Sequence, residues 1–281
     1  MSIDPIISTG VEISDAEMRS IQDAIMKRYG IDFFNYESKS FKRRLQRIYR
    51  KFNFKSSFDL WSRTLKDKDF VHDFINEVSV GLTSLFRDPE YWKTFKSVCE
   101  EHFSNQYRVN VWHAGCSSGE EIFTTAIVWD ELGFRDKVRS LATDISSNAL
   151  EKAQSGRIIK PKLSEYERNL KLYNSKADLY RYFKEDENEI ILKPYFLDKV
   201  KFKNSNLIME DYGVDQYDII FCRNVLIYFD GPAKEKVMEK IYKALKPGGF
   251  FIIGFLDSML NYLPEERFEY YDLRQRIFRK L

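Results

Sequence analysis

The chain has 281 residues, of which 43% are hydrophobic, so it is long enough for one large hydrophobic core and a smaller one. Lys and Arg total 45 against 43 Asp and Glu, and a net charge of +2 neither favours nor excludes a polyanionic partner. The longest purely apolar stretch, residues 250–256, is far shorter than the roughly 20 residues of a membrane helix. Three scattered cysteines favour a reducing compartment and offer no metal-ligand spacing. We therefore expect a cytoplasmic globular protein without membrane insertion or a metal centre, and a monomer is the simplest oligomeric state.

Residues 1–86 carry the apolar spacing of helices and form the expected N-terminal helical domain. Ser14 and Glu17 make a capping-box pair, and the helix that follows them ends at Gly30. The other helices of this domain are expected over residues 39–55, 58–65 and 70–78.

The helix over residues 39–55 has an apolar and a charged side. Its apolar residues recur at spacings of four, three and four, which places them on one stripe; they are Phe41, Leu45, Ile48 and Phe52. The stretch contains eight Lys or Arg and no Asp or Glu, and Arg43, Arg47 and Arg50 fall on the opposite side. Such a charge run is usually a solvated face, but it also suits an acidic partner. A nucleic acid is the rival partner, although no nucleic-acid-binding motif accompanies the helix.

From about residue 88 the pattern changes to alternating strands and helices. Asp88 and Pro89 predict an N-cap and first-turn pair at the start of a helix that reaches residue 103. Strands are expected at residues 108–113, 137–144, 200–204, 217–222 and 250–255, and helices at 120–132, 147–154 and 233–245. This order predicts an α/β domain over residues 87–281, a doubly wound, Rossmann-like sheet whose ligands bind at the carboxyl ends of the strands. Residues 156–195 are charged, Tyr-rich and break the alternation, so they predict a small inserted subdomain.

The stretch VWHAGCSSGEEI, residues 111–122, follows an expected strand and opens an expected helix. Its GCSSG segment satisfies G-x-S-x-G, the pattern around the nucleophile of α/β-hydrolases. Such an enzyme needs a histidine after the serine, but the three histidines all precede Ser117; they are His72, His102 and His113. Without a general base a serine hydroxyl is a weak nucleophile, so the pattern favours a cofactor loop instead.

The same stretch has the features of a nucleotide-like cofactor site. Gly115 and Gly119 allow a tight turn and the close approach of a ligand. Asp144 ends the next strand about 20 residues on, where an acidic side chain binds ribose hydroxyls in nucleotide-binding folds. Glu120 and Glu121 at the helix start would repel a pyrophosphate but suit the amino group and sulfonium of S-adenosylmethionine (SAM). Glutamates in the first turn also stabilise a helix through its dipole when no ligand is bound. The presence of Asp144 at the next strand end makes this simpler interpretation less favoured than a ligand site.

Five stretches together resemble the chemotaxis receptor methyltransferases (CheR), SAM-dependent enzymes that methylate glutamate side chains on the cytoplasmic coiled coils of chemoreceptors. They are LTSLFRDPEYW at residues 82–92, WHAGCSSGEE at 112–121, LATDIS at 141–146, FCRNVLIYFD at 221–230 and LKPGGFFIIG at 245–254. The last is common to many methyltransferases, whereas FCRNVLIYF and T-x-x-F-R are more specific. The resemblance covers nearly the whole chain, including the helical domain.

The resemblance implies roles around the methionine and ribose portions of SAM. Thr83 and Arg87 would reach over the cofactor from the linker between the domains, and Gly115 would let the backbone approach it. Glu121 would contact the methionine portion, and Asp144 the ribose. Arg87 would also act as a catalytic residue that orients the incoming carboxylate through a bidentate hydrogen bond, with a linker salt bridge as its alternative role.

The resemblance also implies roles for residues nearer the C-terminus. Asn206 and Leu207 would border the adenine, while Arg223 and Asn224 would close the pocket beside the sulfonium. Tyr228 would lie near the transferred methyl group as a second catalytic residue, unless it only packs in the core.

In the helical domain, the resemblance implies that the basic helix is a receptor-binding surface. Its contact residues would be Lys39, Arg43, Arg47 and Arg50, facing the acidic helical bundle around the methylation sites. No nucleic-acid partner is expected in that case.

The chain departs from the usual family pattern at several positions. Gly81 stands where an Asn is usual, which removes a hydrogen bond to the cofactor from this otherwise cofactor-binding position. Leu85 replaces a Phe, and His113 replaces a small polar residue; we expect His113 to pack without a catalytic part. Residues 182–194 lack the glycine-containing extension of members that dock on a receptor-tail pentapeptide, and so predict independence of such a tail.

Methylation of a glutamate needs no general base, because a carboxyl group with a pKa near 4.3 is already an anion at neutral pH. That chemistry agrees with the lack of a histidine after residue 113. Two other functions stay open: a SAM-binding regulatory or scaffold protein without turnover, and an RNA methyltransferase.

Overall fold

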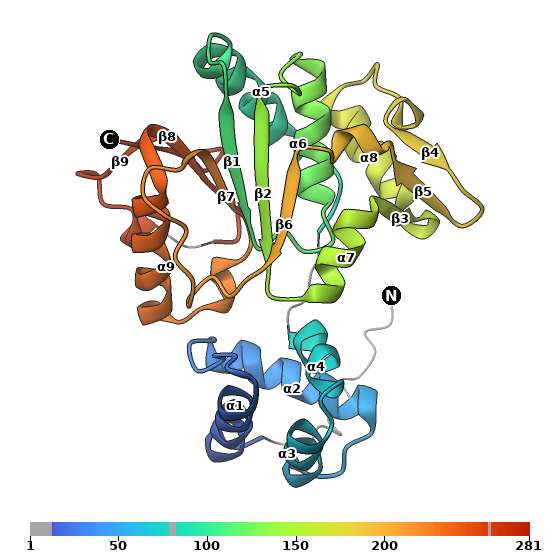
Figure 1. Ribbon diagram of the computed structural model, residues 1–281, viewed down its shortest axis with the longest axis vertical. Coiled ribbons are helices and arrows are strands. Elements are labelled where there is room, and N and C mark those ends of the chain that lie inside the picture. Colours follow the sequence, from blue (N-terminus) through green and yellow to red (C-terminus); the bar gives the residue numbers. More distant parts are fainter. Residues whose placement is uncertain (1–12, 79–82, 258–259) are drawn as a thin grey trace, which may run out of the picture. The chain divides into compact units, whose positions relative to one another are not determined.

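A computed structural model describes residues 13–78, 83–257 and 260–281 (Figure 1). The chain divides into a helical unit and a sheet unit. The helical unit comprises Met1–Val80 together with Tyr228–Asp230, and the sheet unit comprises Gly81–Ile227 and Gly231–Leu281.

The helical unit contains the helices expected from its apolar spacing. They are α1 (Asp15–Tyr29), α2 (Ser38–Phe52), α3 (Ser57–Lys66) and α4 (Phe70–Val78). The capping box of α1 is confirmed, since the Ser14 side chain accepts the Glu17 N–H and the Glu17 carboxylate accepts the Ser14 N–H. Gly30 ends the helix with a φ of 68°, a conformation that glycine adopts without strain.

The two sides of α2 lie as the sequence pattern predicts. Phe41, Leu45 and Ile48 are fully buried. Burial of three such side chains contributes about 6 kcal/mol, which accounts for a helix whose composition is otherwise strongly polar. Arg43 and Arg50 are exposed on the other side.

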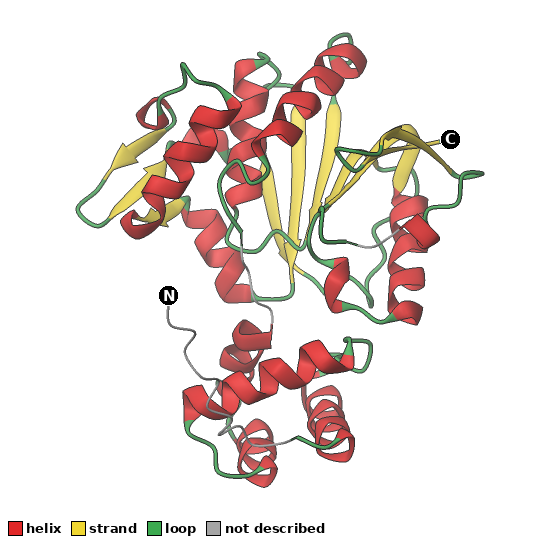
Figure 2. Cartoon of the chain, turned by 180° about the vertical axis from the view of Figure 1, so that it is seen from behind, coloured by secondary structure: helices red, strands yellow, loops and turns green. Residues whose placement is uncertain are grey.

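The sheet unit is a mixed sheet of seven strands in the order β6-β2-β1-β7-β8-β10-β9. The strands are β1 (Val109–Ala114), β2 (Val138–Asp144), β6 (Val200–Asn204), β7 (Tyr217–Cys222), β8 (Leu245–Ile253), β9 (Phe268–Asp272) and β10 (Ile277–Lys280). The helices are α5 (Pro89–Phe103), α6 (Glu120–Glu131), α7 (Ser147–Ser155) and α9 (Gly231–Ala244). Helices lie on both sides of the strands (Figure 2), and the first five strands are parallel. The predicted α/β fold class is confirmed.

The C-terminal part of the sheet differs from the sequence prediction. The expected helix over residues 233–245 and strand over 250–255 leave the KPGG segment, residues 246–249, between them, but this segment lies inside β8, which begins at Leu245. The register between β7 and β8 shifts there, and a Cβ on Gly249 would lie 2.8 Å from the Lys246 carbonyl oxygen. β9 and β10, which the alternation did not predict, add an antiparallel pair to the edge of the sheet.

The inserted segment forms its own small sheet of three antiparallel strands, β3 (Arg157–Ile159), β5 (Glu189–Leu192) and β4 (Phe183–Glu185), with helix α8 (Leu163–Tyr173). Three of its tyrosines, Tyr166, Tyr173 and Tyr182, place their rings in the main core, and two of their hydroxyls donate to the Glu131 carboxylate on α6. The two are Tyr173, at 2.7 Å, and Tyr182, at 3.1 Å.

No helix among the described residues is both long and apolar enough to span a membrane.

Candidate functional site at the carboxyl edge of the sheet

The loop between β1 and α6 turns sharply at the carboxyl edge of the sheet. Gly115 and Gly119 have φ values of 74° and 95°, and Ser117 between them has 51°. The N–H groups of Gly115 and Cys116 both donate to the Thr143 carbonyl oxygen at 2.9 Å, which ties the loop to the end of β2. A Cβ on Gly119 would lie 2.8 Å from the Ala153 side chain. Both glycines are therefore required by this turn.

Asp144 lies at the end of β2, as predicted. Its carboxylate accepts the Ser117 N–H at 2.8 Å and the Ser146 N–H at 2.9 Å. Burial raises the pKa of the Asp144 carboxyl, and the two backbone hydrogen bonds oppose that rise. The acidic side chain is thus fixed in place beside the glycine loop.

The loop after β6 lies next to Asp144. The Ser205 N–H donates to the Asp144 carbonyl oxygen at 2.9 Å, and the Asn206 side chain accepts the Ile208 N–H at 3.0 Å. Leu207 is buried. The ammonium group of Lys240 on α9 donates to backbone carbonyl oxygens of this loop, including that of Glu210 at 2.6 Å.

The loop after β7 is held by a buried aspartate that the sequence analysis did not select. Asp257 accepts the N–H groups of Asn224 at 2.6 Å, Gly254 at 2.9 Å and Ile227 at 3.1 Å. Asn224 has a φ of 59°, and a Cβ on Gly254 would lie 2.5 Å from its side chain. Asp257 follows the end of β8, so the rule that ligands bind at strand ends would have drawn attention to it.

Glu121 and Arg223 meet at this edge, together with His113. One Glu121 carboxylate oxygen is 3.0 Å from His113 Nδ1, and the other is 3.6 Å from the Arg223 guanidinium. The Arg223 side chain is only 4% exposed and lies 4.5 Å from the Tyr91 ring centroid. His113 was expected to pack without a further role, and its contact with Glu121 was not predicted.

The segment before α5 carries Thr83, Arg87 and Asp88. The prediction that the Asp88 side chain caps α5 is wrong, because Asp88 makes no side-chain capping bond and instead pairs with Arg223 at 2.8 Å. A buried guanidinium left without a carboxylate costs more free energy than a helix end left without a side-chain cap. The Phe86 N–H donates to the Thr124 hydroxyl on α6 at 3.0 Å, which holds the segment against the sheet unit.

Thr83 and Arg87 are both half-buried. The Arg87 carbonyl oxygen accepts the Trp92 indole N–H at 2.8 Å, which fixes the backbone beside the Asp88–Arg223 pair. Gly81 lies outside the described residues.

Tyr228 groups with the helical unit. There its carbonyl oxygen accepts the Glu37 N–H at 2.9 Å, and the Arg44 guanidinium lies 5.4 Å from its ring centroid.

The predicted receptor-binding residues share the exposed side of α2. Arg43, Arg47 and Arg50 line one hollow together with Arg44 and Lys51. Arg47 and Lys51 both pair with Glu77, whose side chain is 7% exposed, at 2.9 Å and 2.5 Å. Lys39 is exposed in the first turn of the same helix.

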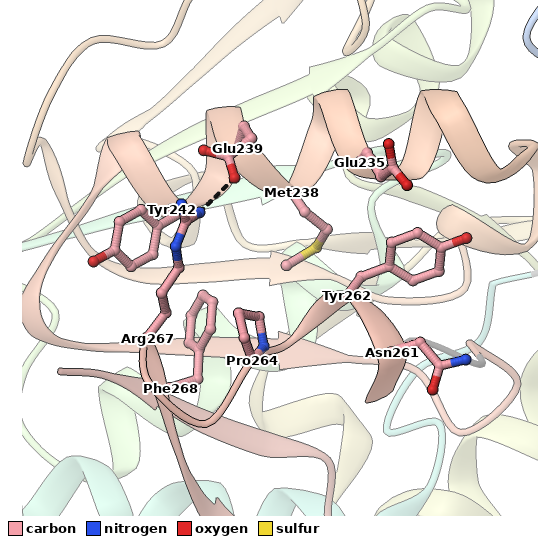
Figure 3. A pocket seen from close by; sticks show the side chains of 9 residues that line it. All are labelled: Glu235, Met238, Glu239, Tyr242, Asn261, Tyr262, Pro264, Arg267 and Phe268. Carbon is pink, nitrogen blue, oxygen red and sulfur yellow. Dashed lines mark hydrogen bonds and ion pairs between the residues drawn. The ribbon is translucent and has the colours of Figure 1, made fainter.

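A separate hollow lies between α9 and the segment before β9 (Figure 3). Its wall includes the Glu239–Arg267 ion pair, and the Arg267 guanidinium lies 4.8 Å from the Tyr242 ring centroid. The residues that line it are distinct from every predicted site residue. They are Glu235, Met238, Glu239, Tyr242, Asn261, Tyr262, Pro264, Arg267 and Phe268.

The carboxyl edge of the sheet fits the expected cofactor. The Asp144 and Glu121 carboxylates would suit a ribose and a positively charged amino group, and the turn at Gly115 and Gly119 would allow close approach. Among the described residues, the buried Nε of Arg223 and the buried hydroxyl of Tyr91 have no hydrogen-bond partner. Such unused donors suit a ligand that brings its own acceptors.

Comparisons with known proteins agree with this arrangement. Residues 16–79 match the all-alpha domain of the CheR methyltransferases, and residues 81–276 match their SAM-binding domain. A Pseudomonas putida protein named Cher3 is 30% identical over 267 residues, 95% of this chain and 97% of that protein. The chemotaxis protein methyltransferase of Salmonella typhimurium is 31% identical over 264 residues, 90% of this chain and 87% of that protein. That of Listeria monocytogenes is 28% identical over 243 residues, 84% of this chain and 88% of that protein. The chain therefore belongs to the CheR methyltransferase family and is a SAM-dependent methyltransferase.

Proposed function

We propose that this methyltransferase acts in chemotaxis, in the cytoplasm, and esterifies glutamate side chains on the helical bundle of chemoreceptors. The observation that carries the proposal is the pairing of Asp144 with the tight loop at residues 115–119, next to Glu121 in the first turn of α6. Relatives that align with most of the chain are named chemotaxis protein methyltransferases, which supports the pathway. Glutamate as the methyl acceptor follows from the family.

The proposed chemistry asks for orientation and not for a base. SAM supplies a methyl group activated by its positive sulfur. A substrate glutamate arrives as an anion at neutral pH, so its oxygen can attack directly. Arg87 orients that carboxylate through two parallel N–H···O bonds, and Tyr228 lines the path of the methyl group. Asp144, Asn206 and Leu207 hold the nucleoside, while the remaining proposed contacts are Gly81, Thr83, Gly115, Glu121, Arg223 and Asn224.

The proposed partner surface is the basic side of α2. Exposed Lys39, Arg43 and Arg50 would attract an acidic helical bundle and set the salt dependence of association. Arg47 contributes less to that attraction because Glu77 already neutralises part of its charge.

The inserted subdomain supports independence of a receptor tail. β4 and β5 are joined by residues 186–188 alone, and the Asp186 N–H donates to the Glu189 carbonyl oxygen at 2.9 Å to close the turn. This short turn leaves no extension against which a tethering peptide could pack. Receptors with and without their tail peptide should be methylated equally, and a large loss of rate on removal of the tail would refute this part of the proposal.

The main test is incubation with radiolabelled SAM and receptor-bearing membranes. The proposal predicts base-labile methanol released from receptor glutamates. A scaffold without turnover would bind SAM and release none, and an RNA methyltransferase would label RNA instead. Arg87→Ala should remove most turnover; near-normal turnover would take Arg87 out of the mechanism.

A further inference from the structure

His113 is enclosed within the sheet unit and has one well-defined polar contact. Its side chain is fully buried near the end of β1 and stacks on the Phe221 ring with centroids 4.8 Å apart and planes within 3°. Nδ1 lies 3.0 Å from a Glu121 carboxylate oxygen, while Nε2 is 3.5 Å from the Thr125 hydroxyl. A buried imidazole held flat against an aromatic ring has little freedom to turn.

The hydrogen-bond inventory assigns the proton between the two side chains. An ionised carboxylate only accepts, so Nδ1 carries the hydrogen and donates it to Glu121. The Thr125 hydroxyl donates to the Ile122 carbonyl oxygen at 2.8 Å, which leaves the Nδ1 bond as the stronger interaction of the ring. His113 therefore acts on Glu121 rather than on Thr125.

Glu121 is held from its other side as well. Its second oxygen is 3.6 Å from the Arg223 guanidinium, which is itself fixed by Asp88 at 2.8 Å. The Glu121 side chain is still 16% exposed, whereas the His113 ring is not exposed at all. The carboxylate is thus oriented from behind by buried groups while part of it stays accessible to a ligand.

We propose that His113 is a positioning residue for cofactor binding, which presets the Glu121 carboxylate for the amino group in the methionine portion of SAM. The inference rests on the proposed role of Glu121. A carboxylate that is already oriented loses less rotamer freedom when the ligand binds, so the gain appears as affinity for ligands that carry the amino group. Ligands that lack this group should be indifferent to His113.

The test compares two nucleosides by calorimetric titration. S-adenosylhomocysteine carries the amino acid portion, and methylthioadenosine keeps the adenosine but lacks that portion. His113→Leu should weaken S-adenosylhomocysteine binding about 5- to 10-fold and leave methylthioadenosine within twofold. His113→Asn, whose amide N–H can replace Nδ1–H, should restore most of the affinity. His102→Leu is the matched control, because the His102 ring lies 3.0 Å from the Tyr271 hydroxyl and does not contact Glu121. This variant should change neither affinity.

The possible results separate this inference from the proposed function. Equal weakening of both nucleosides in His113→Leu would mean a structural role and would overturn the inference. A loss of S-adenosylhomocysteine affinity in Glu121→Gln but not in His113→Leu would overturn it too, with the cofactor site intact. Failure of the unmodified protein to bind either nucleoside would instead refute the proposed cofactor residues.

Discussion

Helix ends in the helical unit and at the carboxyl edge of the sheet differ in their caps and in their backbone angles. α1 and α3 both begin with a complete capping box, and Gly30 ends α1 with the positive φ that glycine favours. At the sheet edge, Ser117, Asn224 and Asp88 adopt positive φ without being glycine, and neither α5 nor α6 has a side-chain cap.

The helical unit follows local rules of helix capping, whereas the carboxyl edge of the sheet departs from them around the proposed cofactor site. The capping boxes of α1 and α3 follow local sequence rules that stabilise helix ends. At the sheet edge, backbone strain of about 1–3 kcal/mol per residue is tolerated in places that hold Asp144, Arg223 and Asn224. Changes at the edge should therefore affect cofactor binding, and changes in the helical unit should not.

The largest effect should follow from Asp144→Asn. The asparagine amide would point a donor at one of the two backbone N–H groups that Asp144 now accepts, and the charge offered to ribose would be lost. Affinity for S-adenosylhomocysteine should fall about 100-fold, equivalent to about 2.7 kcal/mol. Asp136→Asn, which alters an exposed aspartate paired with Lys199 before β2, serves as the control. A change below threefold in Asp144→Asn would remove this residue from the ribose site.

Gly119→Ala should have the next largest effect. The added methyl would lie 2.8 Å from the Phe123 ring and 2.9 Å from the Ala153 backbone, at a φ of 95°. We expect a loss of about 2 kcal/mol in unfolding free energy, measured by urea denaturation. Gly133→Ala is the matched control because Gly133 also has a positive φ, 70°, but has no atom within 4 Å of a Cβ. It should cost about 1 kcal/mol, and equal losses would show that the close approach at Gly119 is unimportant.

Much of this contrast was predictable from local patterns. The capping box at Ser14 and the apolar stripe of α2 depend on neighbours within one or two turns, so spacing alone located them. The positions of Asp144 at the end of β2 and of Glu121 at the start of α6 were predicted because strand ends and helix starts can be recognised in a sequence.

The remaining features depend on partners far apart in the chain. Asp88 looked like a helix cap, and its real partner, Arg223, is 135 residues away. The contact between His113 and Glu121 depends on which face of β1 the ring occupies, and apolar residues on both faces of a buried strand hide that choice. The hairpin of β9 and β10 escaped detection because its strands are only five and four residues long, too short for a clear alternation.

Charge reversal on the exposed side of α2 should weaken the proposed receptor contact without affecting the cofactor site. Arg43→Glu combined with Arg50→Glu should slow association with receptor-bearing membranes about 10-fold at low salt, with little effect at high salt. Binding of S-adenosylhomocysteine should stay unchanged. The control is Lys66→Glu combined with Lys68→Glu, which makes the same charge change at and just after the end of α3. Similar slowing in both pairs would mean that net charge, and not the α2 surface, governs association.

The smallest effect should come from Glu17→Gln in the capping box of α1. Hydrogen bonds from the Ser57 hydroxyl and from the N–H and hydroxyl of Ser14 lower the pKa of Glu17 to about 2. The folded chain therefore binds fewer protons than the unfolded chain between pH 4.5 and 2. The stabilisation is complete above pH 4.5 and is lost as the pH falls toward 2.

Urea denaturation of the full chain should show the sign of this dependence. At pH 7, Glu17→Gln should lower the unfolding free energy by about 0.5 kcal/mol, and the difference from the unmodified chain should shrink at pH 3.5. Ser57→Ala, which removes the strongest of the hydrogen bonds to Glu17, should weaken the same pH dependence. An equal difference in unfolding free energy at pH 7 and pH 3.5 would mean that the protonated Glu17 side chain caps α1 as well as its carboxylate does. Because Glu17 contacts Ser14 and Ser57 within the helical unit, no variant at Glu17 should alter S-adenosylhomocysteine affinity at neutral pH.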